Sequence, residues 1–267
     1  MRMAHLDGMR LHYRLDGNPK GAPVVFANSL GTDLRLWDQV MPLLPPQFCY
    51  LRYDKRGHGL SDGPPAPYSM GMLTRDAELL MDHLGITGAI FVGLSIGGMI
   101  AQALAVKRLD LIRAVVLSNT GARIGTRDLW QDRIDAVRAG GIESLADATM
   151  ERWFSKTFRQ TDDLYAWRNM LVGQRAEGYV GCCAAIQGTD LITPTSGLRL
   201  PALGIAGSED GATPPDLVRE TLGLIPGSDV ALIRGAGHLP CVEAPEAYAR
   251  ILSDFILAQG HGGDAAL

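Results

Sequence analysis

Gly93-Leu94-Ser95-Ile96-Gly97-Gly98 decides the fold, because it follows the apolar run Ala89 to Val92 and precedes the helix-like run Met99 to Leu104. This order predicts a strand, a sharp turn and a helix, with a serine between glycines at the turn. Small neighbours allow the turn to hold its central residue in a strained conformation that lifts the hydroxyl clear of the sheet. An ordinary loop can carry the same G-x-S-x-G spacing, so the rest of the chain has to separate the two interpretations.

Two later loops supply the partners that a serine nucleophile needs. A serine hydroxyl is a weak nucleophile unless a histidine takes its proton, and that histidine needs an acid to fix its tautomer. Asp210 follows the strand-like run 202–207, and His238 follows the strand-like run 230–233. We therefore predict Ser95, Asp210 and His238 as catalytic residues, in the chain order of an α/β-hydrolase triad.

The base and the acid each have one alternative. His58 lies in Asp54-Lys55-Arg56-Gly57-His58-Gly59-Leu60-Ser61, directly after a strand-like run, and is the second candidate base. We interpret this segment as a structured turn in which Asp54 and Arg56 pair. Glu209 neighbours Asp210 in the same turn and is the second candidate acid. The remaining histidines lie in or before the first strand-like run, in a helical stretch and in a glycine-rich tail: His5, His12, His83 and His261.

The composition favours a compact enzyme that acts on small molecules. Hydrophobic residues make up 46% of the 267 positions, enough for a core on both faces of a sheet. A net charge of -4 without a basic cluster argues against a nucleic-acid partner. The N-terminus has no apolar signal core, and no apolar run approaches the roughly 18 residues of a membrane span, so we expect no membrane partner.

The cysteines indicate a reducing compartment. Cys49, Cys182, Cys183 and Cys241 have neither the spacing of metal ligands nor the density of a disulfide scaffold. We therefore expect a cytoplasmic protein. Its oligomeric state is open, and a homo-oligomer is compatible with the sequence.

Short apolar runs alternate with helical stretches along most of the chain, which predicts an α/β fold with a mostly parallel sheet flanked by helices. The strand-like runs are Met9–Leu15, Val24–Ala27, Cys49–Tyr53, Ala89–Val92, Ala114–Ser118, Leu203–Ala206 and Val230–Ile233, and the helical stretches are Met70–Leu84, Ile96–Arg108, Leu217–Leu224 and Ala247–Leu257. From about 121 to 198 only helical patterns occur, such as Asp128–Ala139 and Ile142–Phe154. We predict a core over 1–120 and 199–260, an inserted helical cap over 121–198, and a flexible tail over 261–267.

With these motifs the chain resembles the α/β-hydrolase superfamily over nearly its whole length. The motifs are Asn28-Ser29-Leu30-Gly31, the segment Asp54 to Ser61, the elbow, and the loops of Asp210 and His238. More narrowly, the chain is similar to bacterial 3-oxoadipate enol-lactone hydrolases of aromatic catabolism at Asn28 to Thr32, Trp37, Trp153-Phe154, Cys182 to Ile186 with Asp190, and Asp210 to Pro215. Many relatives carry His-Gly where this chain has Asn28-Ser29, so no role of that histidine is transferred here.

The resemblance implies acyl transfer in two halves. Ser95, deprotonated by His238 and supported by Asp210, attacks a lactone carbonyl, while the backbone N–H groups of Leu30 and Ile96 hold the oxyanion. An enol oxygen leaves, and water activated by His238 then cleaves the acyl-enzyme. No metal and no organic cofactor is required.

A lactone substrate that bears a carboxylate needs a cation or hydrogen-bond donors beside it. The predicted cap supplies Arg133, Arg138, Arg152 and Trp153, and Arg133 follows Trp130 by three residues on a helical stretch, so both can face one cleft. We predict Arg133 and Trp153 as substrate-binding residues. The alternatives are a solvated helix face for each arginine and packing between cap and core for Trp153.

The sequence is compatible with three functions. The first is an enol-lactonase. The second is another serine hydrolase, either a carboxylesterase or an enzyme that cleaves carbon–carbon bonds of ring-fission products, and fold alone does not separate these. The third is a non-catalytic small-molecule receptor that retains the triad.

Overall fold

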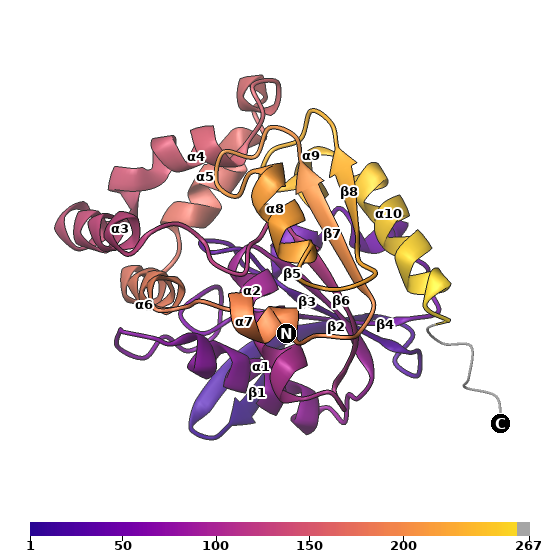
Figure 1. Cartoon of the computed structure of the whole chain (residues 1–267). Coiled ribbons are helices and arrows are strands. Elements are labelled where there is room, and N and C mark those ends of the chain that lie inside the picture. Colours follow the sequence, from indigo (N-terminus) through magenta and orange to yellow (C-terminus); the bar gives the residue numbers. More distant parts are fainter. Residues whose placement is uncertain (261–267) are drawn as a thin grey trace.

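The computed structural model describes residues 1–260, which are built around an eight-stranded sheet (Figure 1). The strand order is β1-β2-β4-β3-β5-β6-β7-β8. The pairs β1–β2 and β2–β4 are antiparallel, and every other neighbouring pair is parallel. The strands are β1 (Arg2–Leu6), β2 (Met9–Gly17), β3 (Pro23–Ala27), β4 (Cys49–Tyr53), β5 (Ala89–Leu94), β6 (Ile112–Ser118), β7 (Ala202–Gly207) and β8 (Asp229–Ile233). The predicted mostly parallel sheet is thus confirmed, and the predicted tail 261–267 lies outside the described residues.

The central strands are buried on both faces of the sheet. Every residue of β4, β5 and β7 is buried, and successive side chains of a strand point to opposite faces. A strand of this kind needs helices on both sides. The helices outside residues 121–198 are α1 (Met70–His83), α2 (Ile96–Lys107), α8 (Pro215–Leu222), α9 (Pro240–Glu243) and α10 (Pro245–Ala258). Of these, α2 packs against β5 and β6, and α8 packs against β7.

Local capping signals explain where several helices begin. The Ser69 hydroxyl accepts the Met72 N–H at 3.2 Å at the start of α1, and proline occupies the first turn of α8, α9 and α10. Short 3-10 turns complete the helical content: η1 (Leu34–Trp37), η2 (Met41–Leu43), η3 (Ile142–Leu145) and η4 (Phe158–Gln160). Among residues 1–260, none of the helices combines the length and the apolar character that crossing a bilayer requires.

Two elements differ from the sequence-based expectations. The strand β1 was not predicted, because a short edge strand that pairs only with β2 and is partly exposed carries a weak alternating pattern. The stretch Ile142–Phe154, expected as one helix, is divided into η3 and α4 (Ala146–Trp153). The spacing of hydrophobic residues does not distinguish a 3-10 turn from the first turn of an α-helix, so the boundary between η3 and α4 could not be predicted from the sequence.

The segment between β6 and β7 holds a group of helices that lies to one side of the sheet in Figure 1. They are α3 (Arg127–Gly140), α4, α5 (Leu164–Val172) and α6 (Ala176–Gln187), with α3 packed on α6 and α4 packed on α5. The short helix α7 (Ile192–Ser196) instead packs against α2, where the Thr195 hydroxyl donates to Gln102 Oε1 at 2.8 Å. The division into a core and a cap over 121–198 stays a prediction, and within that range α7 packs against the core helix α2.

Candidate active site

Ser95 lies on the tight turn that joins β5 to α2. Its φ of 58° places a residue with a side chain in the left-handed half of conformational space, where strain is stored. A Cβ at Gly93 would collide with the backbone of Gly97, and one at Gly97 would collide with the carbonyl of Ala27. The close approach of three backbone segments therefore requires glycine on both sides of the serine, which is why the spacing predicts this turn.

Asp210 and His238 pair in the interior beside this turn. Asp210 Oδ2 lies 2.9 Å from His238 Nδ1, and both residues are buried. The backbone N–H groups of Ala212 and Thr213 donate to Asp210 Oδ1 at 2.7 and 2.9 Å. Burial opposes ionisation of Asp210, but His238, the Asn119 amide and the Thr213 N–H outweigh it and hold the pKa of the carboxyl below its ordinary value. An ionised Asp210 fixes the histidine tautomer in which Nε2 is unprotonated, and this nitrogen lies 3.4 Å from the Ser29 hydroxyl.

The alternative base and acid have other partners. His58 Nε2 accepts the Gly31 N–H at 3.0 Å, and burial together with Lys55 lowers the pKa of this histidine well below its ordinary value. Glu209 is exposed, and its carboxylate accepts the Lys156 N–H at 3.3 Å. These contacts support His238 over His58 and Asp210 over Glu209.

The expected pairing of Asp54 with Arg56 is wrong. Arg56 forms a bidentate pair with Asp76 of α1, with both distances 2.6 Å. Asp54 instead contacts His12 Nδ1 at 2.8 Å and accepts the Leu34 N–H at 2.7 Å. The chain turns sharply after β4, so residues two apart point to different neighbours: Arg56 to α1, and Asp54 to the segment that follows β3.

One narrow cavity of about 40 Å³ brings most of the predicted residues together. It is lined by Ser29, Leu30, Ser95, Ile124, Trp130, Arg133, Thr149, Arg152, Trp153, Tyr179, Ala212, Thr213 and His238. Within residues 1–260, the Leu30 N–H donates to no protein acceptor. Ile96 is the first residue of α2, where an amide has no partner inside the helix. Both predicted oxyanion donors are thus available beside Ser95, and a helix N-terminus favours negative charge there.

Asn119 and Thr213 are site residues that sequence reasoning missed. The Asn119 amide donates to Asp210 Oδ2 at 2.8 Å, and the Thr213 hydroxyl lies 2.8 Å from the same oxygen and 3.1 Å from His238 Nδ1. Asn119 directly follows β6 and has a φ of 45°. A polar residue just after a buried strand was the signal that pointed to Asp210 and His238, and it could have found Asn119 as well.

The carboxyl end of α4 is attached to the loops of the acid and the base. The Arg152 carbonyl accepts the Gly211 N–H at 3.1 Å, and the Trp153 carbonyl accepts the His238 N–H at 2.7 Å. The Trp153 ring also stacks on the His238 ring, with centroids 6.3 Å apart and planes at 26°. Trp153 therefore packs against the predicted base and also lines the cavity, and its role in substrate binding stays a prediction.

Two arginines bring positive charge into the cavity. Arg133 Nε donates to the Tyr179 hydroxyl and Nη2 donates to the Thr149 hydroxyl, both at 2.8 Å. Arg152 is half-buried, and burial together with the neighbouring charge of Arg133 lowers the pKa of its guanidinium. In the described part of the chain, no carboxylate lies within ion-pair distance of either arginine. Arg138, in contrast, is exposed on α3.

Within residues 1–260, no three His, Cys, Asp or Glu side chains gather in a way that could hold a metal ion. The four cysteines are all free and buried. Burial raises the pKa of the Cys182 thiol to about 12, so it stays protonated near neutral pH.

The chain is similar to known hydrolases over nearly its full length. A family model described as the alpha/beta hydrolase fold matches residues 22–245. The sequence is 32% identical over 248 residues to 3-oxoadipate enol-lactonase 2 of Acinetobacter baylyi, covering 89% of this chain and 90% of that protein. The crystal structure of the enol-lactonase from Burkholderia xenovorans LB400 has a TM-score of 0.92 at 39% identity, covering 96% of this chain and 100% of that one. A hydrolase from Pseudomonas aeruginosa PA01 has a TM-score of 0.91 at 35% identity, covering 96% and 97%. The predicted resemblance is confirmed: the chain is a hydrolase that belongs to the α/β-hydrolase family.

Proposed function

We propose that this hydrolase opens an enol-lactone that carries a carboxylate, 3-oxoadipate enol-lactone, to give 3-oxoadipate. The observation that carries the proposal is the pair Arg133 and Arg152 in the Ser95 cavity, since neither guanidinium has a carboxylate partner in the described residues. A half-buried cation without a counter-ion is destabilising, and a carboxylate on the substrate would offset that cost. The name of the relative from Acinetobacter baylyi, 3-oxoadipate enol-lactonase 2, supports this substrate, and that of the enol-lactonase from Burkholderia xenovorans supports an enol-lactone.

The proposed first half of the reaction forms an acyl-enzyme. Ser95 Oγ bonds to the lactone carbonyl carbon while its proton passes to His238 Nε2, and the carbonyl oxygen becomes an oxyanion held by the N–H groups of Leu30 and Ile96. The ring C–O bond then breaks, and the proton on His238 goes to the departing enol oxygen. The freed enol converts to its ketone, which draws the reaction forward.

The proposed second half releases the product with the same groups. His238 takes a proton from water, whose oxygen attacks the acyl carbon, and the collapse of the second oxyanion returns the proton to Ser95 Oγ. Asp210 stays ionised throughout, because it accepts hydrogen bonds from Asn119 and Thr213 in addition to its contact with His238. Every atom and proton is thus accounted for by the substrate, one water molecule and the triad.

The helices α3 to α6 would act as a cap that supplies substrate contacts to a triad held on the sheet. In support, Arg133, Thr149, Arg152 and Tyr179 all belong to this segment and line the cavity with Ser95. We further propose a role in the catabolism of aromatic compounds. The four free cysteines support a location in the cytoplasm, where thiols stay reduced.

A comparison of kcat/KM across substrates tests the proposed function. The panel contains the carboxylated enol-lactone, simple neutral esters and ring-fission dienoates. We expect the carboxylated enol-lactone to be cleaved fastest, and preferred over its own neutral ester analogue. A clear preference for neutral esters would indicate a carboxylesterase, and a preference for dienoates would indicate a carbon–carbon bond hydrolase.

Replacing Arg133 with methionine should raise KM for the carboxylated lactone by about 10- to 100-fold, because a charge-assisted hydrogen bond contributes about 1.5–3 kcal/mol. The KM for a neutral ester analogue should change by less than about twofold, since this substrate leaves the guanidinium unpaired already. Steady-state kinetics on both substrates measures the difference. Arg138→Met is the matched control, because Arg138 is exposed on the same helix. Equal changes for both substrates, or none, would remove Arg133 from the site and weaken the acidic-lactone proposal.

A further inference from the structure

The predicted oxyanion donor Leu30 N–H belongs to the same peptide group as the Ser29 carbonyl. A peptide group is planar and trans, so its C=O and N–H point in opposite directions. Whatever fixes the Ser29 carbonyl therefore also fixes the direction of the Leu30 N–H. The Ser29 carbonyl accepts hydrogen bonds from Lys55 Nζ at 2.6 Å, Thr32 Oγ1 at 2.9 Å and the Thr32 N–H at 3.3 Å.

Lys55 is an unusual residue for this position, because its side chain is buried and 3% of the residue is exposed. Its ammonium also donates to the Thr32 carbonyl at 3.3 Å, and among residues 1–260 no carboxylate lies within ion-pair distance of it. Burial lowers the pKa of Lys55 to about 8, although the more distant charges of Asp54 and Asp33 oppose this shift. An apolar residue would fill the same space without the cost of burying an ammonium.

Two neighbouring backbone amides of the loop after β3 are already engaged by the protein. The Gly31 N–H donates to His58 Nε2 at 3.0 Å, and the Thr32 N–H donates to the Ser29 carbonyl. Asn28 is held through its side chain, which accepts from Trp37 Nε1 at 2.8 Å and donates to the Tyr53 carbonyl at 2.9 Å. The Leu30 N–H, in contrast, has no protein acceptor within residues 1–260, and Leu30 lines the Ser95 cavity.

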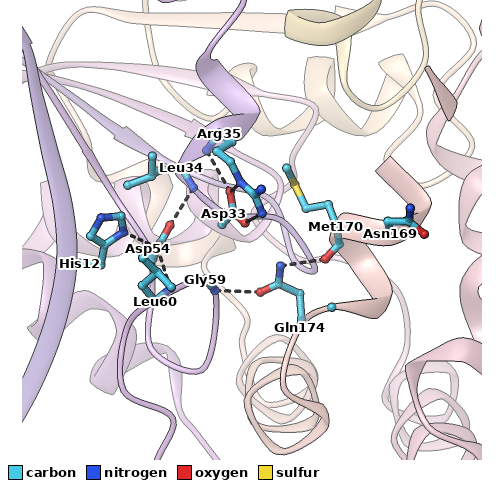
Figure 2. A pocket seen from close by; sticks show the side chains of 11 residues that line it. His12, Asp33, Leu34, Arg35, Asp54, Gly59, Leu60, Asn169, Met170 and Gln174 are labelled. Atoms are coloured by element: carbon cyan, nitrogen blue, oxygen red, sulfur yellow. Dashed lines mark hydrogen bonds and ion pairs between the residues drawn. The ribbon is translucent and has the colours of Figure 1, made fainter. Parts of the chain in front are cut away.

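The residues that follow the loop line a second pocket, of about 390 Å³, whose polar groups are largely engaged (Figure 2). Asp54 holds the Leu34 N–H, as Figure 2 shows, and Asp33 is paired with Arg35 at 2.6 Å. Gln174, from the inserted segment, accepts the Gly59 N–H at 2.9 Å. Because these polar groups already form hydrogen bonds or ion pairs within the protein, we interpret them as groups that stabilise the loop after β3 and not as a ligand-binding site.

We propose that Lys55 is a positioning residue of the active site, which aims the Leu30 N–H at the oxyanion by holding the carbonyl of the same peptide group. Its positive charge behind the peptide also polarises that group, which strengthens the N–H as a donor when negative charge develops on the substrate. This inference rests on the proposed acyl transfer at Ser95. It assigns to the turn after β4 a part in the reaction in addition to a structural one.

Replacing Lys55 with methionine should lower kcat by about 10- to 100-fold, since loss of a whole oxyanion donor costs about 10²–10³-fold and this change misdirects one donor. KM should stay within about twofold, because the donor acts on the transition state. The control is Lys107→Met, the same change on a lysine that pairs with Glu78 at the far end of α2, and it should keep full activity.

A trifluoromethyl ketone gives a readout that a purely structural role would not change. Ser95 Oγ adds to its carbonyl carbon, His238 takes the proton, and the oxygen becomes an oxyanion in the same place as in the reaction. Its inhibition constant should weaken by the same factor as kcat/KM in Lys55→Met. An unchanged kcat, a rise in KM alone, or a loss of activity without a parallel loss of inhibitor affinity would each overturn the proposal.

Two further measurements separate a failure of this proposal from misfolding of the Lys55 variant and from a failure of the proposed function. If Lys55→Met does not fold, Thr32→Val removes another donor to the Ser29 carbonyl and should show a smaller loss, about 3- to 10-fold, with the same parallel between kcat/KM and inhibitor affinity. A fluorophosphonate should label Ser95 in the wild type and in Lys55→Met. Absence of labelling in the wild type would overturn the proposed function and this inference together, whereas labelling with full kcat in Lys55→Met would overturn this inference alone.

Discussion

Ser95→Ala should abolish turnover of every lactone and ester that the wild-type protein cleaves. Without the hydroxyl no acyl-enzyme can form, and loss of one triad member lowers kcat by up to about 10⁶-fold. The fold should persist, because the Ser95 side chain forms no capping hydrogen bond in α2 and the backbone N–H of this residue still donates to the Ser118 carbonyl at 3.0 Å. Alanine is strained at a positive φ to the same extent as serine, so the free energy of unfolding should change little.

Activity assays together with circular dichroism and thermal unfolding check this expectation. Ser144→Ala, on the exposed segment after α3, serves as the matched control and should be fully active. Near-normal activity in a correctly folded Ser95→Ala protein would end the assignment of a serine nucleophile, whatever the substrate is.

The parts of the site that the sequence predicted are those with local signals. Gly93 is required by a backbone contact within the strand–turn–helix unit, and Gly97 is required by the nearby carbonyl of Ala27. Both glycines stand at a fixed spacing from Ser95, so the elbow could be predicted from six consecutive residues. Asp210 and His238 each follow a strand, and the carboxyl ends of parallel strands meet at one edge of a sheet. Local spacing and the order of the strands were therefore enough to bring these residues together.

The support around the triad could not be predicted, because it depends on contacts between distant segments. The Trp153 carbonyl holds the His238 N–H across 85 positions of sequence, and no periodicity in α4 indicates that its last carbonyls point at the triad loops. Lys55 stands in a segment with other charged residues and has the sequence appearance of a surface lysine. Its burial follows from the packing of the turn after β4 against the loop after β3, which only the folded chain shows.

The burial of the arginines in residues 121–198 also differs from what the sequence led us to expect. Sequence reasoning treated the arginines of the inserted segment as equivalent and chose Arg133 on its spacing from Trp130. The structure places Arg152 in the same cavity and leaves Arg138 in solvent. Helical spacing gives the face on which a residue lies, but the depth of burial depends on which helices pack together.

Asp210→Asn should lower kcat by about 10⁴-fold, the effect expected when the acid of a triad loses its charge but keeps its shape. Asp210 Oδ2 accepts hydrogen bonds from the Asn119 amide and the Thr213 hydroxyl and contacts His238 Nδ1. If the NH₂ group of the new asparagine takes this position, it faces other donors. If it donates to His238 Nδ1 instead, it stabilises the wrong tautomer of the histidine. Glu209→Gln is the matched control, because the same charge is removed from the neighbouring, exposed residue.

The Glu209 variant should keep kcat within about twofold of the wild type, since an exposed charge that holds only a surface amide contributes little. Steady-state kinetics with a single ester substrate, with thermal unfolding to confirm that both variants fold, separates the two residues. The direct contact of 2.9 Å between Asp210 and His238 Nδ1 leads us to expect a difference of several orders of magnitude between them. If Glu209→Gln were the more damaging change, Glu209 would be the acid, and the loop after β7 would have to present a different residue to His238 during the reaction.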